Sequence, residues 1–446
     1  MTESTTTPQS AARSPGLKLL LIALLTVAMA IPLFAINLTL SEREGRAFEV
    51  ATDVANGWGG QQIVAGPIVL VPYTQTDTQI VDGRSVELQS RHMAAIMPGK
   101  LRLDATADAS ERHRGIFDVP VYRSDVSFHA EFGKAELAAA IPSGATPLWN
   151  EAVVTTLVSD PRGLADNVTL TANGRTIDFE PGAGIENGSL PGIHASLGVA
   201  EPPERLVLDA RFALRGVKEL SFVPLGRSTT SRLASDWQSP SFFGAFLPGE
   251  HHEDAKGFHA DWSVPYLARG FAQNFVATDA SLTKIQESNF GVRFYKPVDF
   301  YQLVERSLKY AVLFVGLGLL TFFVAELVAG RRLHAVQYVL VGAAQVLFYL
   351  LLLSFAEHTG FLLAYALAAA ATVILTALYA RSAFASTVRA AVLGAVMAAL
   401  YALLYVILNS EDDALLIGSL LLFAALGATM FVTRKTDWYR VVPVAP

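Results

Sequence analysis

The densest group of potential metal ligands in the sequence is His251-His252-Glu253-Asp254, with His259 a few residues further on. Imidazole nitrogens and carboxylate oxygens at close spacing can bind zinc or another borderline metal. The spacing differs from His-Glu-x-x-His, however, and such a charged run is typical of a solvated loop. We therefore predict no bound metal and no cofactor, and keep metal binding by the three histidines as the alternative.

A carboxylate inside an apolar segment is the second candidate. Glu326 lies near the end of the apolar run 310–328, within about one helical turn of Arg331. Ionisable residues in membrane-spanning helices usually face the protein interior or a water-filled cavity, and they mark function by default. The simpler interpretation is that Glu326 reaches the interface or pairs with Arg331 or Arg332. A role in moving protons or ions is the alternative.

Polar residues of the next apolar run form a third group. Gln337, Tyr338 and Gln345 fall roughly on one face of a predicted helix, and such residues more often hydrogen-bond helices together than carry chemistry. Glu357 and His358 follow at the end of this run. His358 could sense pH there, although a helix end exposed to water is the simpler interpretation.

Several reaction classes lack their sequence signature. The sequence has no cysteine, which excludes disulfides, iron–sulfur clusters, Cys-ligated zinc and thiol nucleophiles. It has no Gly-x-Ser-x-Gly elbow, P-loop or dinucleotide fingerprint. The formal net charge of −6 also argues against a nucleic-acid surface, which needs a basic patch. We predict that the protein is no enzyme and binds no nucleic acid.

Six apolar runs must position these residues in a lipid bilayer. The runs cover 17–40, 310–328, 336–355, 361–379, 390–408 and 414–432. Each is close to the ~20 residues that a helix needs to cross the hydrocarbon core. Among the short connections and the tails, Lys and Arg occur only in alternate ones, and such segments stay in the cytoplasm. The sequence therefore predicts six spans, both termini in the cytoplasm, and a large segment outside the membrane after the first span.

The predicted domains follow from these runs. They are a disordered cytoplasmic tail at 1–16, a transmembrane helix at 17–40, a periplasmic β-rich domain at 41–308 with a possible sub-boundary near 182–192, a five-helix bundle at 309–433 and a cytoplasmic tail at 434–446. The first run also resembles a signal peptide cleaved after Ala30. Its apolar stretch continues to Leu40, longer than a typical signal, so we favour a retained anchor.

The segment 41–308 reads mainly as β-structure. Residues 41–57 predict a short helix that continues the first span and stops at Gly57. Further on, Asp82-Gly83 and Asn173-Gly174 each predict a hairpin turn between alternating strands. Ten or more such strands suggest a β-sandwich or two linked β-modules. After a stiff turn at 296–299, Glu305 and Lys309 offer an i,i+4 pair on a helix that leads into the second span.

The sequence contains several uncommon motifs, three of which include Trp58, Trp237 and Trp262. They occupy 56–67 (Asn-Gly-Trp-Gly-Gly-Gln-Gln-Ile-Val-Ala-Gly-Pro), 114–122, 236–248, 257–262, 290–311, 337–342 and 348–358. Together they resemble the cell envelope integrity inner membrane protein CreD family, over about residues 40–380. The resemblance implies an inner-membrane protein with a large periplasmic domain and a role in tolerance to colicins and other envelope stress. It implies no particular reaction.

The fold class predicted is a membrane α+β protein with one N-terminal and five C-terminal transmembrane helices. As functional candidates we name Glu326, Arg331, Gln337, Glu357 and His358, together with the three tryptophans, which we expect to pack at strand junctions. The predicted function is non-catalytic support of the cell envelope, in which the β-domain binds a periplasmic or inner-membrane protein. A transporter or ion pathway through the helices, a membrane-tethered envelope enzyme and a signalling receptor are the alternatives.

Overall fold

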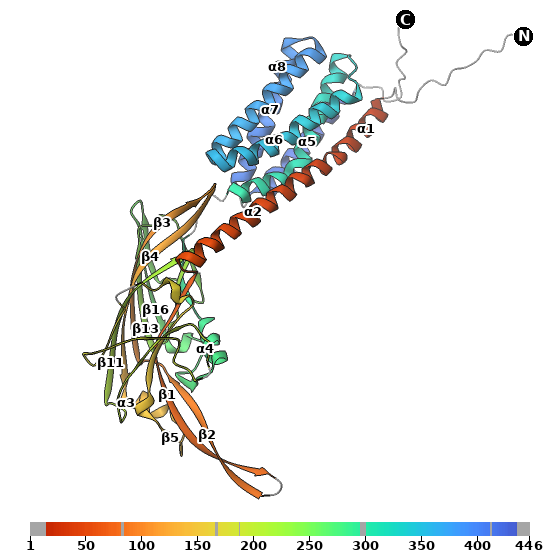
Figure 1. Cartoon of the computed structure of the whole chain (residues 1–446). Coiled ribbons are helices and arrows are strands. Elements are labelled where there is room, and N and C mark those ends of the chain that lie inside the picture. The colour runs from red at the N-terminus through yellow and green to blue at the C-terminus, as the bar shows by residue number, and fades with distance from the viewer. Residues whose placement is uncertain are drawn as a thin grey trace, which may run out of the picture. The chain divides into compact units, whose positions relative to one another are not determined.

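The structure of the chain is a computed structural model, which describes residues 15–81, 84–165, 168–186, 188–294, 300–410 and 413–434. The chain divides into two compact units, which are described separately below. The helical unit comprises Met1–Arg46 and Val298–Pro446, and the β unit comprises Ala47–Pro297 (Figure 1). This arrangement confirms the predicted fold class of apolar helices on either side of a β-rich domain in the sequence.

Six of the described helices are long and apolar enough to cross a membrane. The long helices are α1 (Pro15–Ala28), α2 (Ala30–Trp58), α5 (Phe300–Ala329), α6 (Ala335–Thr359), α7 (Phe361–Phe384), α8 (Thr387–Asn409) and α9 (Ala414–Thr433), with α1 and α2 together forming the first span. In α5 and in α6, half of the residues in the most apolar 18-residue stretch are buried inside the protein. In α9, none of the residues in the corresponding stretch are buried. Helices α5 and α6 are therefore the centre of this unit.

The first span packs against α5 and α6 just before Ala30. A Cβ on Gly316 of α5 would lie 3.1 Å from Cγ2 of Thr26, and one on Gly342 of α6 would lie 3.3 Å from Sδ of Met29. Further on, α2 continues to Trp58, which confirms the short helix predicted to stop near Gly57. The retained anchor stays a prediction.

The β unit consists of two large sheets. Its strands are β1 (Gln62–Val81), β2 (Arg84–Ile96), β3 (Lys100–Arg114), β4 (Phe117–Gly133), β5 (Thr146–Pro147), β6 (Val153–Val158), β7 (Thr169–Ala172), β8 (Arg175–Ile177), β9 (Glu180–Pro181), β10 (Gly192–Ser196), β11 (Arg205–Val217), β12 (Glu219–Phe222), β13 (Ser228–Ser235), β14 (Pro240–Gly244), β15 (Glu250–Asp254), β16 (Gly257–Pro265), β17 (Asn274–Val276) and β18 (Phe290–Phe294). Two short helices, α3 (Lys134–Ala139) and α4 (Asp279–Gln286), connect them.

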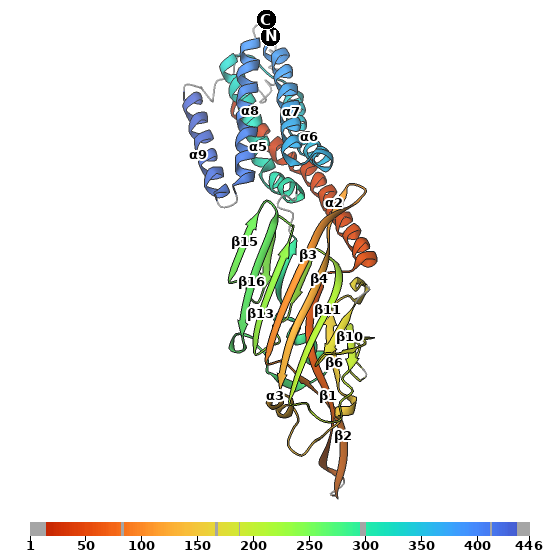
Figure 2. The ribbon, with the colours of Figure 1, turned by 90° about the vertical axis from the view of Figure 1, so that its left-hand side faces the viewer.

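The two sheets differ in strand order. The first runs β14-β18-β12-β1-β6-β10-β9, with β2 paired to β1 and β17, and β5 paired to β1. The second runs β15-β16-β13-β3-β4-β11-β7-β8 (Figure 2). Most neighbours are antiparallel, but β1 with β12 and β3 with β13 are parallel pairs between strands far apart in the sequence.

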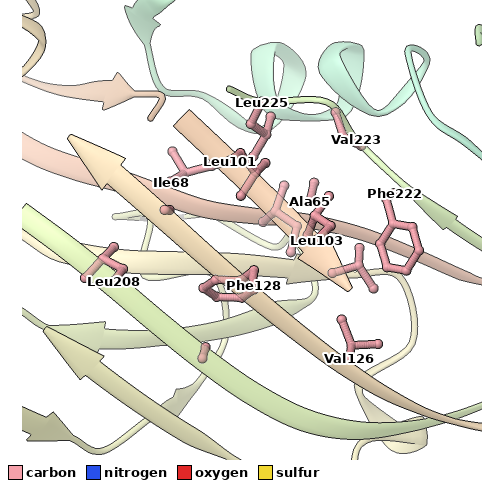
Figure 3. Packing of buried hydrophobic residues seen from close by; sticks show 14 of the residues in the cluster. Ala65, Ile68, Leu101, Leu103, Val126, Phe128, Leu208, Phe222, Val223 and Leu225 are labelled. Carbon is pink, nitrogen blue, oxygen red and sulfur yellow. The ribbon is translucent and has the colours of Figure 1, made fainter. Parts of the chain in front are cut away.

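One hydrophobic core joins the two sheets. Ala65 and Ile68 of β1 belong to the same buried cluster as Leu101 of β3, Phe128 of β4 and Leu208 of β11 (Figure 3). Burial alternates along β3 and β4, because successive side chains of a strand point to opposite faces of the sheet. A single shared core favours the β-sandwich over two linked modules. The predicted sub-boundary at 182–192 stays a prediction.

Local sequence signals placed several elements correctly. Ala172 pairs with Arg175 across Asn173-Gly174, and both turn residues have positive φ values, 48° and 77°, as a type I′ turn requires. Val81 pairs with Arg84, which confirms the other hairpin, although its turn at 82–83 lies outside the described residues.

The entry into the second span is partly described. The predicted turn at 296–299 lies outside the described residues, but α5 runs without a break from Phe300 into the second span. Lys309 Nζ lies 3.0 Å from Glu305 Oε1 in this helix, which confirms the predicted i,i+4 pair.

Candidate functional site

The helical unit contains an ion pair between its first and second spans, in which the carboxylate is buried and the lysine is half-buried. Lys18 of α1 donates a hydrogen bond from Nζ to Oε1 of Glu326 on α5. The hydroxyl of Tyr338 on α6 donates to the other carboxylate oxygen, Oε2, at 2.6 Å. The Glu326 side chain is only 8% exposed. Three helices therefore meet at one carboxylate.

Lys18 is satisfied by further groups of the same cluster. Its ammonium also donates to the carbonyl oxygen of Leu333 at 2.6 Å and lies 5.5 Å from the centre of the Tyr338 ring. A buried carboxylate is costly unless a charged partner and hydrogen bonds surround it, and both are present here. The sequence analysis named Arg331 or Arg332 as the partner of Glu326. That expectation was wrong, because Lys18 fills this position and both arginines are exposed.

A second ion pair joins the first span, here through α2, to the bundle near the other end of α6. Arg43 Nε of α2 lies 3.7 Å from Oε1 of Glu357, and the Tyr301 hydroxyl lies 3.4 Å from the same oxygen. The Glu357 side chain is only 7% exposed. The neighbouring His358 is exposed, and its Nδ1 lies 3.1 Å from the carbonyl oxygen of Ser354 on its own helix. Glu357 is thus part of the helix packing, whereas His358 faces outward.

Gln337 has a different role from the one that the sequence suggested. Its side-chain oxygen accepts a hydrogen bond from the backbone N–H of His334 at 2.8 Å, and it thereby completes the N-terminal cap of α6. Tyr338 and Gln345 are buried, but Gln337 is half-buried. The expectation that all three share one inter-helix face was wrong for Gln337. Its position at the third residue of the helix places its amide beside the free N–H groups of the helix start.

Trp262 and Trp237 both contact aromatic side chains of the β unit. Trp262 of β16 is 3% exposed, lies 5.3 Å from Phe290 between ring centres and donates from Nε1 to the carbonyl oxygen of Phe246 at 3.2 Å. Trp237, between β13 and β14, is half-buried and lies edge-on to Phe294 at 6.2 Å. Both tryptophans lie where strands of the two sheets approach one another.

Trp58 ends α2 and stacks on arginine. The guanidinium of Arg112 lies 3.7 Å from its ring centre and that of Arg215 lies 5.0 Å away. Its indole N–H donates to the carbonyl oxygen of Tyr122 at 3.3 Å. The end of α2 also packs on a small apolar cluster that includes Val119 and Val217. The contacts tie the helix end to β3, β4 and β11, which are interior strands of the second sheet.

The glycines after Trp58 allow the backbone to approach closely. Gly59 has a φ of 125°, and a Cβ there would lie 2.6 Å from the carbonyl oxygen of Arg215. The N–H of Gly60 donates to Oδ2 of Asp160 at 2.8 Å. Hydrogen bonds from Arg162 and from Gly60 lower the pKa of Asp160. The segment Trp58-Gly59-Gly60 therefore packs closely against the backbone of Arg215 and the side chain of Asp160.

The histidine cluster lies on an edge strand. Glu250–Asp254 form β15, which is exposed along its whole length, and His252 pairs in register with His259 of β16. The two imidazole rings lie 5.5 Å apart, while His251 contacts the ring of Phe242 instead. Within the described part of the chain, no group of three or more potential ligands is placed to hold a metal ion. The predicted loop was wrong, because these residues form a strand.

The outer face of the second sheet carries a polar groove of about 570 Å³ across β3, β4, β11 and β7. His129 lines it and contacts Asp209 through Nδ1 at 2.7 Å. That contact, with a weaker one to Glu131, raises the pKa of His129. Arg102 and Arg211 line the same groove. The sequence analysis missed this site, because its members come from strands whose pairing is not visible in the sequence.

The longest protrusion of the β unit is a two-stranded ribbon. Thr76–Val81 of β1 pairs with Arg84–Gln89 of β2 in a continuous antiparallel register. Other strands pair with β1 only up to Thr74 and with β2 only from Ala94 onward, among the residues that the structure describes. Figures 1 and 2 show the ribbon extending beyond the rest of the sheet. We call these twelve residues the ribbon.

Comparison with known proteins places the chain in a family. A family model described as "Inner membrane protein CreD" matches residues 14–439. The chain belongs to the CreD family. The Inner membrane protein CreD of Escherichia coli (strain K12) is 32% identical over 413 residues, which cover 92% of this chain and 91% of that protein. The two comparisons confirm the resemblance carried by the tryptophan phrases and support a multi-pass protein of the inner membrane.

Solved structures add nothing to this assignment. The M1 zinc metallopeptidase from Deinococcus radiodurans matches with 11% identity, covering 44% of this chain and 42% of that chain, at a TM-score of 0.21. A likeness at this level carries no argument about the fold or the activity of this CreD-family protein.

Proposed function

We propose that this CreD-family protein supports the integrity of the cell envelope without catalysing a reaction. In this proposal the helices hold the protein in the inner membrane, and the β unit lies in the periplasm, where it binds an envelope protein. The alternation of basic connections supports this orientation, with both termini in the cytoplasm. The family assignment supports the membrane location.

The ribbon is the observation that carries this proposal. Each strand of the ribbon has six residues, which at ~3.4 Å each give a length of about 20 Å. This length lies beyond β5 and β17, which pair with the outer edges of β1 and β2. An isolated two-stranded ribbon is only marginally stable in water. Its outer edges also present backbone N–H and C=O groups that can pair with another chain. A ribbon of this kind fits a partner that adds a strand to it.

Site-specific photo-crosslinking in intact cells tests the proposal. Thr76 and Gln89 face each other in the ribbon and are both exposed, so a photoreactive residue at either position reports on the ribbon. Lys256, exposed in the turn between β15 and β16, is the matched control. We expect a discrete protein adduct from the ribbon positions and none from Lys256. Equal labelling at all three positions would contradict a partner-binding ribbon.

A proton or ion pathway through the helices is the second candidate. It is favoured by the burial of Glu326 beside Lys18 and Tyr338, because ionisable groups within spans often mark such pathways. Liposomes that contain the purified protein and an internal pH dye would test it. A proton leak that Glu326→Gln abolishes would support the pathway, and a leak no larger than that of empty liposomes would exclude it.

A further inference from the structure

We propose that the helical unit binds one structural water molecule between Gln345 and Tyr349 of α6, at its contact with α5 and α8. The site is independent of the ribbon and of the ion pairs of Glu326 and Glu357. Its ligand is water, held by an amide and a phenol in an otherwise apolar part of the bundle. The following three observations point to it.

The first observation is a buried hydroxyl without a partner. Tyr349 is 1% exposed, and its hydroxyl has no hydrogen-bond partner among the described residues. Neighbouring Tyr365 shows the usual arrangement, since its hydroxyl donates to the carbonyl oxygen of Tyr401 at 2.6 Å. Leaving a buried polar group without a partner is costly, so buried groups are nearly always satisfied by protein or by water. Tyr349 therefore requires a ligand.

The second observation is a buried amide one helical turn away. Gln345 is 2% exposed, and its Nε2 donates to the carbonyl oxygen of Val341 at a long 3.4 Å. An amide side chain has two donors and an acceptor, so Gln345 retains capacity for another bond. Gly318 of α5 makes room for this amide, since a Cβ there would lie 2.1 Å from its oxygen.

The third observation is a small cavity beside both groups. Gln345 and Tyr349 line it together with Phe314, Met397 and Tyr401, all of them buried. It leaves about 10 Å³ for the centre of a water molecule, which is near the minimum of about 10–15 Å³ that one water requires. Larger ligands do not fit. Buried waters typically join polar groups that protein atoms leave unsatisfied.

The direction in which Tyr349→Phe shifts the melting midpoint tests the site. Tyr349→Phe removes the hydroxyl and keeps the ring. If a water joins this hydroxyl to Gln345, the variant leaves the water and the amide short of a partner, and the melting midpoint should fall by about 2–4 °C. If the cavity is dry, the variant removes an unsatisfied hydroxyl, and the midpoint should stay the same or rise. The full-length protein in lipid nanodiscs is the sample.

Two further variants calibrate the result. Tyr365→Phe removes a hydroxyl with a known protein acceptor, so its shift shows what one lost hydrogen bond is worth in this bundle. Gln345→Leu should lower the midpoint, and the double variant with Tyr349→Phe should lower it by less than the sum, because both residues act through one water. A midpoint that is unchanged or raised in Tyr349→Phe, or additive effects in the double variant, would overturn the proposal.

Discussion

Lys18 forms an ion pair with the buried carboxylate of Glu326, although the two residues lie 308 positions apart in the chain. The pair joins the first span to the second, and Tyr338 adds the third span through the same carboxylate. Arg43 of α2 and Glu357 of α6 form a second, longer contact between the first span and the bundle. The N-terminal helix is thus attached to the bundle by two of its basic residues, and this explains why carboxylates occur in or beside apolar helices.

The first prediction concerns this pair. Lys18→Met should destabilise the protein by about 3–5 kcal/mol, because it leaves the buried Glu326 carboxylate without a charged partner. Glu326→Gln should cost less, because the Lys18 side chain that it leaves unpaired is only half-buried. The double variant should recover part of the loss, since no charge then remains unpaired. The amount of protein in the membrane and its melting midpoint measure this effect.

Lys309 provides the control for that experiment. Its pair with Glu305 is exposed, and an exposed i,i+4 pair contributes only about 0.3–0.5 kcal/mol. Lys309→Met should therefore have a much smaller effect than Lys18→Met. Equal effects of the two substitutions would show that burial does not determine the strength of the Lys18 pair.

The second prediction concerns topology. A reporter that is active only in the periplasm should be active when fused after Asp299, Glu357 or Asp412. The same reporter should be silent after Arg332, Ser386 or Tyr439, because the connections that carry Lys and Arg stay in the cytoplasm. One reversed pair of fusions would contradict the orientation with both termini in the cytoplasm.

The sequence predicted features that depend on neighbouring residues. Hydrophobic length located the spans, and Asn173-Gly174 located a hairpin, because both signals are local. It did not reveal that β1 would pair with β12 in parallel, or that Lys18 would meet Glu326, because such contacts depend on how distant segments pack. Gln337 was misassigned for a different reason. Its helical spacing suggested a contact with another helix, but its position at the start of α6 makes it part of the N-terminal cap.

The third prediction concerns the tryptophans. Trp262→Ala should destabilise the protein by about 3–5 kcal/mol, because the side chain is buried in the core of the β unit. Trp58→Ala should cost less, since Trp58 is half-buried and stacks on Arg112, a contact of about 0.5–1 kcal/mol at exposed sites. Susceptibility to protease in isolated membranes measures both. Normal abundance of Trp262→Ala with loss of envelope-stress tolerance would indicate a binding role instead.

The fourth prediction concerns pH. The Asp209 carboxylate raises the pKa of His129 in the folded protein, so this contact stabilises the β unit fully below an unfolded pKa of about 6.5 and loses its effect as the pH rises through the folded pKa. Protease resistance should therefore fall between about pH 6 and pH 8. The fall should be smaller in His129→Gln and in Asp209→Asn. An unchanged pH dependence in both variants would exclude His129 as its source.

The fifth prediction removes the ribbon and tests the central claim of partner binding most directly. Gln75 and Ser90 pair across the base of the ribbon, so an Asn-Gly turn that replaces 76–89 can join them as a two-residue hairpin. The measurement is tolerance to envelope stress in cells that carry this variant at the abundance of the wild type. We predict that tolerance falls to the level of cells without the protein while the protein remains in the membrane. Full tolerance at normal abundance would contradict the account.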